Sequence, residues 1–146
     1  MSEQTLQQQQ QQLKKKLSLE TGKRKTAIAR AVVKPGKGRI YVNDYPVENI
    51  TPEVAKMKVM EPLIIAGDRA RQVDVRVSIE GGGVMGQAEA ARIAIARALA
   101  GWTKSSELRK SFMAFDRVMI AGDQRVTEPK KFGGPSARRR KQKSYR

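Results

Sequence analysis

Lysine and arginine side chains are the residues of this sequence best placed to do chemistry, and many of them lie in two clusters. The chain has 146 residues, with 30 Lys plus Arg against 14 Asp plus Glu, so its formal net charge is +16. Ammonium and guanidinium groups held close together attract phosphates and release the counterions that surround a polyanion. The clusters therefore predict contacts to the phosphate backbone of a nucleic acid, which hold it without reading its bases.

The first cluster lies between positions 21 and 40, where seven residues are basic and none is acidic. Its members are Lys23, Arg24, Lys25, Arg30, Lys34, Lys37 and Arg39. The second cluster follows position 123 and has nine basic residues and one acidic residue. Its basic residues include Lys130, Lys131, Arg138, Arg139, Arg140 and Lys141. Near its end, Tyr145 offers an aromatic ring that can stack on a base.

The two clusters flank a middle part, residues 41–123, that carries eleven groups of each sign. Mixed signs are typical of a solvated surface, whereas segregated charge of one sign repels itself and favours a polyanionic partner. Two alternatives stay open for the basic runs. They could form a solvated face, or the final run could be a non-specific polybasic tail or a nuclear address.

The composition excludes much of the usual enzyme repertoire, because the chain has no His and no Cys. It lacks an imidazole base, a thiolate nucleophile and the ligands of a structural zinc site, so we expect no cofactor, no metal and no catalysis. No apolar run is long enough to span a membrane, so we expect no membrane partner. The start of the chain is rich in Gln where a signal peptide would be apolar, which predicts an intracellular protein.

A glycine-rich stretch at 81–86, GGGVMG, formally matches the dinucleotide fingerprint between a strand and a helix. A nucleotide-binding enzyme is disfavoured, because the acidic residue expected about twenty positions later falls in a predicted helix. We favour a tight turn in which glycine allows close backbone approach. A compatible function is phosphate binding at the start of the helix, through Gly82, Gly83 and Gln87.

Three segments follow from the pattern along the chain: a disordered Gln- and Lys-rich tail at 1–20, a globular domain at 21–123, and an extended basic tail at 124–146. Within the domain, we expect a hairpin of two strands, 26–34 and 39–42, joined by a Pro-Gly turn. Alternation of Val73, Val75, Val77 and Ile79 with polar residues predicts a half-buried strand.

Helices are expected at three places. The first begins at Thr51-Pro52-Glu53 and is interrupted by Pro62, with residues 63–66 buried beyond it. The second runs from 87 to 100, contains seven alanines that let it lie close on a sheet, and is closed by Gly101. The third begins near Ser105 and has a buried face of Leu108, Phe112 and Phe115. We expect Trp102, between the last two helices, to pack in the core.

Taken together, these residues resemble the family of the ninth small-subunit ribosomal protein. The stretch TGKRKTAIAR at 21–30 is similar to the opening signature of the family, and GGGVMGQAEA at 81–90 with IAIARAL at 93–99 to its central turn and helix. The residues from Asp116-Arg117 through Gly133-Gly134 resemble its tail, and the ending QKSYR is similar to archaeal and eukaryotic members. The resemblance covers about residues 20–146.

This resemblance implies an α/β (α+β) two-layer sandwich: a four-stranded sheet, helices on one face, and a left-handed crossover like that of the second domain of the fifth ribosomal protein. It implies a structural, non-catalytic constituent of the small ribosomal subunit, cytoplasmic in ribosomes, that binds rRNA in the head beside neighbouring head proteins. Lys130, Lys131 and residues 138–141 of the tail would contact this rRNA. The tail would reach the peptidyl-site tRNA through Lys143, Tyr145 and Arg146. The alternative from another class is a free-standing, non-specific nucleic-acid-binding protein.

Overall fold

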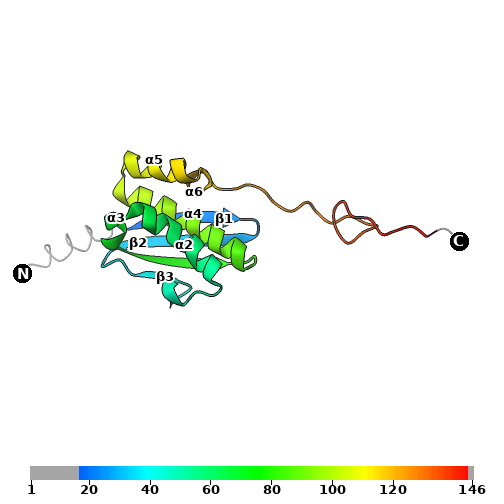
Figure 1. Cartoon of the computed structure of the whole chain (residues 1–146), viewed down its shortest axis with the longest axis horizontal. Helices are drawn as coiled ribbons and strands as arrows, with labels where there is room; N and C mark the ends of the chain where they lie inside the picture. The colour runs from blue at the N-terminus through cyan, green and yellow to red at the C-terminus, as the bar shows by residue number, and fades with distance from the viewer. Residues whose placement is uncertain (1–16, 145–146) are drawn as a thin grey trace, which may run out of the picture.

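The computed structural model describes residues 17–144 and shows helices packed against one face of a five-stranded sheet (Figure 1). The strands are β1 (Ser18–Arg24), β2 (Ala27–Pro35), β3 (Ile40–Val42), β4 (Tyr45–Pro46) and β5 (Val73–Glu80). The helices are α2 (Glu53–Ala66), α3 (Asp68–Arg71), α4 (Val84–Thr103), α5 (Ser106–Phe115) and α6 (Val118–Ala121), with a 3-10 helix, η1 (Val47–Asn49). The general α/β class is confirmed. The predicted count of four strands is wrong, because the two-residue β4 adds a fifth.

The sheet has the order β1-β2-β5-β3-β4, and all neighbours are antiparallel except β3 and β5. The expected hairpin of 26–34 with 39–42 is therefore wrong: both strands form, but β5 lies between them. The Pro-Gly segment crosses the end of β5, where the Gly36 amide donates to the Gln72 carbonyl oxygen at 3.0 Å. β2 pairs instead with β1, which includes residues 18–20 of the predicted tail. The prediction for residues 1–16 lies outside the described residues.

Strict alternation along the two central strands explains why one face of the sheet is covered. Residues 27, 29, 31 and 33 of β2 and 73, 75, 77 and 79 of β5 are buried, whereas the residues between them face outward. The alanine-rich α4 lies against this inner face, as expected. Its approach to β1 is close, since a Cβ atom at Gly22 would lie 2.6 Å from the Ala94 nitrogen.

Two helices extend beyond their predicted limits. α4 begins three residues early and passes through Gly101, and Lys104, in the left-handed conformation with φ 48°, caps its end. α2 begins at Glu53 without a side-chain cap and continues through Pro62, which is buried. The expectation that all of 63–66 is buried is wrong, because Ile64 is 72% exposed.

The last helices support the point where the tail leaves the body. α5 begins as expected, with the Ser105 hydroxyl accepting from the Leu108 amide at 3.3 Å. Leu108 and Phe112 are buried, and Trp102 packs against the core, but the predicted burial of Phe115 is wrong, since its side chain is 60% exposed. From Gly122 to residue 144 the described chain contains no helix or strand, and it runs away from the folded body (Figure 1). Among the described helices, none is both long and apolar enough to span a membrane.

Candidate nucleic-acid interface

The first basic cluster is divided between the two ends of β2. Lys23 and Lys25 lie at the β1–β2 turn, whereas Lys34, Lys37 and Arg39 lie at the opposite end of the nine-residue strand. At about 3.3 Å per residue, these ends are about 26 Å apart. Arg30 lies between them on the outward face of the sheet and pairs with Glu80 at 3.4 Å. The cluster is continuous in sequence but forms two separate surfaces in the fold.

Arg24 differs from its neighbours because its charge is used inside the protein. Its side chain is 14% exposed, and its guanidinium pairs with Glu89 on α4 and, from Nη1 to Oδ2 at 2.9 Å, with Asp123. Two carboxylates neutralise the charge, and the group is largely withdrawn from solvent. This placement counts against the predicted phosphate contact for Arg24 and gives it a structural role instead.

The start of the tail is tied down by a set of interactions around Arg24. The Arg97 guanidinium donates to the carbonyl oxygens of Ile120 at 2.9 Å, Ala121 at 3.0 Å and Thr21 at 2.8 Å. These bonds join the last turn of α6 to β1. The tail therefore leaves the body at a defined place, beside the β1–β2 turn.

Asp123 completes this anchor, because its carboxylate meets Arg125 as well as Arg24. Arg125 donates to it from its backbone amide at 2.9 Å and from Nη2 at 2.6 Å. Hydrogen bonds from the Arg125 side chain and amide lower the pKa of Asp123 to about 2. The same pairing raises the pKa of Arg125. Both groups thus stay charged throughout the neutral range, which keeps the ion pairs intact.

The β1–β2 turn and the start of the tail form one surface. A cavity of about 270 Å³ lies between them and is lined by Lys23, Lys25, Gly122, Gln124 and Val126, together with the anchor residues Arg97, Ala121 and Asp123. Both lysines are exposed, and neither has an ion-pair partner within residues 17–144. A phosphate chain following the tail would therefore meet the turn at its base.

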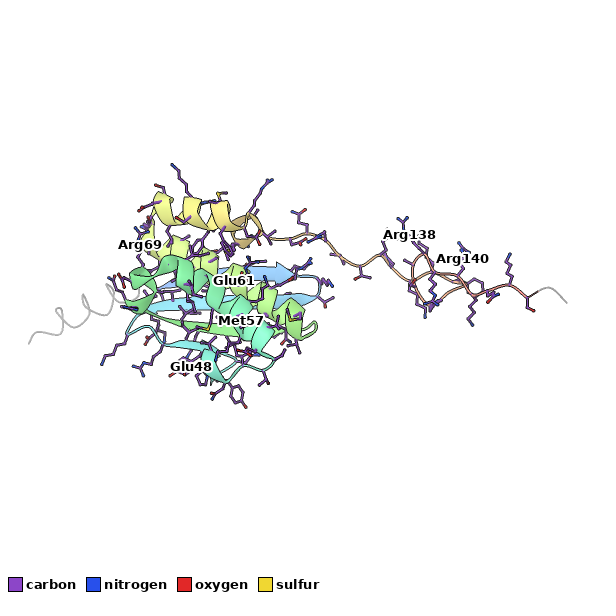
Figure 2. All side chains as sticks on the ribbon, in the orientation of Figure 1. Glu48, Met57, Glu61, Arg69, Arg138 and Arg140 are labelled. Carbon is purple, nitrogen blue, oxygen red and sulfur yellow. The ribbon has the colours of Figure 1, made fainter. Side chains whose placement is uncertain are left out.

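The tail presents nearly all of its basic side chains to solvent (Figure 2). Arg138 donates two hydrogen bonds to Glu128, from Nε to Oε2 at 2.9 Å and from Nη2 to Oε1 at 2.7 Å. This pairing lowers the pKa of Glu128. The other predicted contacts in the tail are exposed and have no carboxylate partner among the described residues: Lys130, Lys131, Arg139, Arg140, Lys141 and Lys143. The remaining two predicted tRNA residues, Tyr145 and Arg146, lie outside the described residues.

At the other end of β2, Asp74 organises the Pro-Gly loop. Its Oδ1 accepts the backbone amides of Lys37 at 2.8 Å and Arg39 at 2.9 Å, and these bonds lower the pKa of the carboxyl. The side chains of Lys34, Lys37 and Arg39 point into solvent around this loop, although the Arg39 guanidinium remains 3.8 Å from Asp74. This loop surface is the second part of the first cluster.

The glycine-rich turn has the structural role that we favoured. Gly81 and Gly82 have φ values of 73° and 71°, and a Cβ atom at Gly82 would lie 2.8 Å from the Ala27 Cβ. The Gln87 side-chain amide donates to the Gly81 carbonyl oxygen at 3.0 Å, so it closes the turn from within. Gly83 faces open space, since a Cβ atom added there would meet no described atom within 4 Å.

A third basic surface was not predicted from the sequence. Lys104 follows the end of α4, Arg109 and Lys110 lie on α5, and Arg117 directly precedes α6. All four are exposed, and within residues 17–144 they form no ion pair. Lys104 and Arg109 line a cavity of about 490 Å³ with Ser105 and Ser106. These residues were missed because residues 41–123 contain equal numbers of acidic and basic groups, so their net charge of zero gives no sign that some basic residues cluster in the fold. The available signal was the stretch from 108 to 115 in the third predicted helix, which contains Arg109 and Lys110 and no acidic residue.

The residues described here offer no group of three or more His, Cys, Asp or Glu that could hold a metal ion. The exposed Lys and Arg side chains can neutralise a polyanion at four places: along the tail, at the β1–β2 turn, at the Pro-Gly loop and along α5. The fold and these surfaces define a class, the small basic α/β proteins with exposed cations suited to a polyanionic partner.

Comparison with known proteins places the chain within this class. Residues 22–146 match the family described as Ribosomal protein S9/S16, and the chain belongs to that family. Three proteins named small ribosomal subunit protein uS9 are among its relatives. The one from Desulfurococcus amylolyticus is 58% identical over 131 residues, which cover 90% of this chain and 94% of the relative. Those from Thermoplasma acidophilum and Aeropyrum pernix are 53% and 50% identical, over 86% and 90% of this chain and 98% and 97% of their own lengths.

Family membership gives the chain its general role. It is a ribosomal protein of the small-subunit kind, a structural constituent that serves translation, and not an enzyme. RNA binding is implied by the family, and the place of action is the ribosome, in the cytoplasm. Two predictions are confirmed by the family match: membership of the ribosomal protein family and the absence of catalysis.

Proposed function

We propose that this chain binds small-subunit rRNA in the head of the subunit, and that its tail neutralises phosphates where rRNA strands crowd together. The proposal rests on one observation: the buried basic residues are paired with carboxylates, whereas most of the exposed ones are not. Arg24 and Arg92, which are largely buried, are each paired with two carboxylates. In contrast, Lys23, Lys25 and most of the exposed tail bases have no carboxylate partner within residues 17–144, the exceptions being Arg125 and Arg138. Unpaired cations along one continuous surface are what a phosphate backbone requires.

The rRNA contact can be tested with a transcript of the 3′ major domain of small-subunit rRNA. Replacing Lys23 and Lys25 with Gln should weaken binding and remove backbone protection at one place in a hydroxyl-radical footprint. Replacing Lys56 and Arg71 with Gln removes the same charge on the α2 side and should leave the footprint unchanged. Equal loss of protection in both double variants would contradict the proposed surface.

The last residues of the tail are proposed to approach the anticodon arm of peptidyl-site tRNA through Lys143, Tyr145 and Arg146. A guanidinium can form a two-pronged contact with phosphate, and a tyrosine ring can stack on a base. Arg146→Ala should impair tRNA holding or decoding accuracy while assembly stays nearly intact. Arg71→Ala serves as the control, since that side chain pairs with Asp68 on the body at 3.3 Å. Normal tRNA binding and decoding by Arg146→Ala subunits would exclude this role.

Two finer features of the fold are part of the proposal. The crossover from β3 through α2 to β5 is inferred to be left-handed, like that of the second domain of the fifth ribosomal protein. The parallel pairing of β3 with β5 is consistent with such a connection. The chain is proposed to act as three segments: an N-terminal tail, a folded domain and a basic tail from 124 to 146. Residues 18–20, predicted in the N-terminal tail, are assigned to the domain, because β1 begins at Ser18.

A free-standing protein that condenses nucleic acid is the alternative that the same charges allow. It would bind DNA and RNA alike and would leave ribosomes when salt is raised. Sedimentation of the tagged chain through a gradient distinguishes the two. An integral constituent should remain with small subunits at a salt concentration that strips loosely bound cations, whereas dispersal of the chain would favour the alternative.

A further inference from the structure

Helix α2 has apolar side chains on two opposite faces, although only one of them packs against the protein. Its inner face contributes Ala55, Val59, Pro62, Leu63 and Ala66 to the core. On the outer face, Val54, Met57 and Ile64 are 58%, 57% and 72% exposed. Their separations of three and seven residues place them in one stripe along the helix. A surface helix with one buried face normally carries polar residues on the other, so this stripe calls for a second partner.

The stripe continues onto the neighbouring elements. Tyr45 of β4 is 69% exposed, and a groove of about 620 Å³ has Pro46, Val47, Met60 and Ile64 along one side. Its other side includes Gly38 and Arg39 of the Pro-Gly loop and Asp68 and Arg71 of α3. Ile64 belongs to both the stripe and the groove, so the two form one apolar surface. Continuous exposed apolar patches of this kind mark sites of protein interaction more often than scattered single residues do.

The charge around the α2 stripe has the opposite sign to the rest of the molecule, whereas the charged residues of the groove, Arg39, Glu48, Asp68 and Arg71, balance each other. Residues 44–66 contain four acidic and two basic residues, a net charge of −2 in a chain of +16. Asp44, Glu48 and Glu53 are exposed. The two lysines are engaged within the protein, Lys56 with the Glu48 carbonyl oxygen at 3.1 Å and Lys58 with Glu61 at 3.0 Å. An acidic rim repels phosphate, which argues against RNA as the occupant.

The acidic rim also argues against a second copy that docks through the same surface. A two-fold interface places identical patches against each other, so the acidic groups of the two rims would be brought together. An apolar patch rimmed by Lys and Arg on a different protein would instead complement both the stripe and the rim. Figure 2 shows Met57 on α2 and Glu48 on η1, well apart from the tail that carries Arg138 and Arg140.

We propose that the α2 face, defined as Tyr45, Glu48, Glu53, Val54, Met57 and Ile64, is a docking site for a second protein that presents an apolar patch rimmed by basic residues. The α2 face shares no residue with the tail, the β1–β2 turn or the Pro-Gly loop, and it meets the loop only across the groove, where Gly38 and Arg39 form the far side. The molecule is thus divided into cationic surfaces for RNA and an acidic, apolar surface for protein.

Photo-cross-linking within assembled small subunits tests this proposal. A benzophenone side chain is introduced at Met57 or at Ile64, and a third version at Arg139 serves as the RNA control. We expect the first two to cross-link to another protein, at a peptide that contains apolar residues beside Lys or Arg. Cross-links from both sites to rRNA or to a second copy of this chain, or no cross-link from either, would overturn the proposal.

The Arg139 control separates this inference from the proposed function. Loss of the rRNA cross-link at Arg139 would count against the proposed RNA contact, whereas loss only at Met57 and Ile64 would count against the docking site. Charge reversal at two exposed residues supplies a second readout, and circular dichroism checks that the variant is folded. Glu48→Lys with Glu53→Lys should lower the protein cross-link from Ile64 by about tenfold, the effect of like charges facing a basic rim. An unchanged yield would overturn the assignment of a basic partner.

Discussion

Removing three charges from the tail should change how strongly rRNA binding depends on salt. Arg139, Arg140 and Lys141 are exposed neighbours, and the structure of residues 17–144 gives none of them a carboxylate partner. Each phosphate that a cation neutralises contributes about 0.7 to 0.9 to the slope of log affinity against log salt. The triple substitution to Gln is therefore expected to reduce that slope by about 2 to 3 units.

This change of slope translates into a measurable difference in affinity. Between about 50 and 200 mM salt, a fourfold range, the unchanged chain should lose about 20- to 40-fold more affinity than the triple variant. Filter binding or fluorescence anisotropy with the 3′ major domain transcript, repeated across this salt range, gives both slopes. Circular dichroism of each variant checks that the folded domain is intact.

A matched control variant distinguishes an effect of where the charges lie from an effect of how many are removed. Substituting Lys56, Lys58 and Arg71 with Gln also lowers the net charge by three, but on α2 and α3, away from the tail. We expect the slope of this variant to stay within about half a unit of the unchanged chain, because these side chains contact no phosphate in the proposed arrangement. If both triple variants lowered the slope equally, binding would depend on overall charge and the reasoning would be refuted.

Three further predictions concern the domain that supports the tail. Gly22→Ala should destabilise the chain by about 3 kcal/mol, because the new Cβ would press against the backbone of α4, whereas Gly86→Ala, with only ordinary contacts near 3.8 Å, should be neutral or stabilise by up to about 1 kcal/mol. Urea unfolding compares the two, and equal effects would contradict the close approach of β1 and α4. Phe112→Ala, at a fully buried side chain, should cost about 3 to 5 kcal/mol, and a loss below about 1 kcal/mol in the same assay would show that α5 is not packed as described. The pKa of Asp123 is lowered from 3.8 to about 2, so its ion pairs contribute to stability above about pH 4 and lose that contribution as the pH falls toward 2. Asp123→Asn should flatten the change in unfolding midpoint over that interval, and a curve parallel to that of the unchanged chain would disprove the anchor.

Elements with a strong local pattern could be predicted from the sequence. Alternating Val73, Val75 and Val77 identified β5, and Ser105 identified the start of α5. Both signals, hydrophobic periodicity and helix capping, depend only on residues close together in the sequence. The pairing of β2 could not be predicted in this way. Two strands joined by a Pro-Gly turn normally pair with each other, but here β5 lies between them. The Gly36 amide bonds to Gln72, which directly precedes β5 and is 36 positions away in the sequence.

The basic site was predictable where its residues follow one another without acids. The tail is such a run, so its exposed cations could be read directly from the sequence. Arg24 could not be separated from Lys23 and Lys25, because its partners Glu89 and Asp123 are distant in sequence and meet it only in the folded chain. The exposure of Ile64 was hidden for the same reason, since an apolar residue beside buried ones gives no local sign that it faces outward.

A cryo-electron microscopy structure of small subunits that contain this chain would test the central claim most directly. The account predicts that the tail lies among rRNA phosphates, with the Arg139, Arg140 and Lys141 side chains within about 4 Å of phosphate oxygens. Lys23 and Lys25 should contact the same strand of rRNA at the base of the tail. A tail that projects into solvent, or that follows protein surfaces without meeting phosphates, would contradict the account.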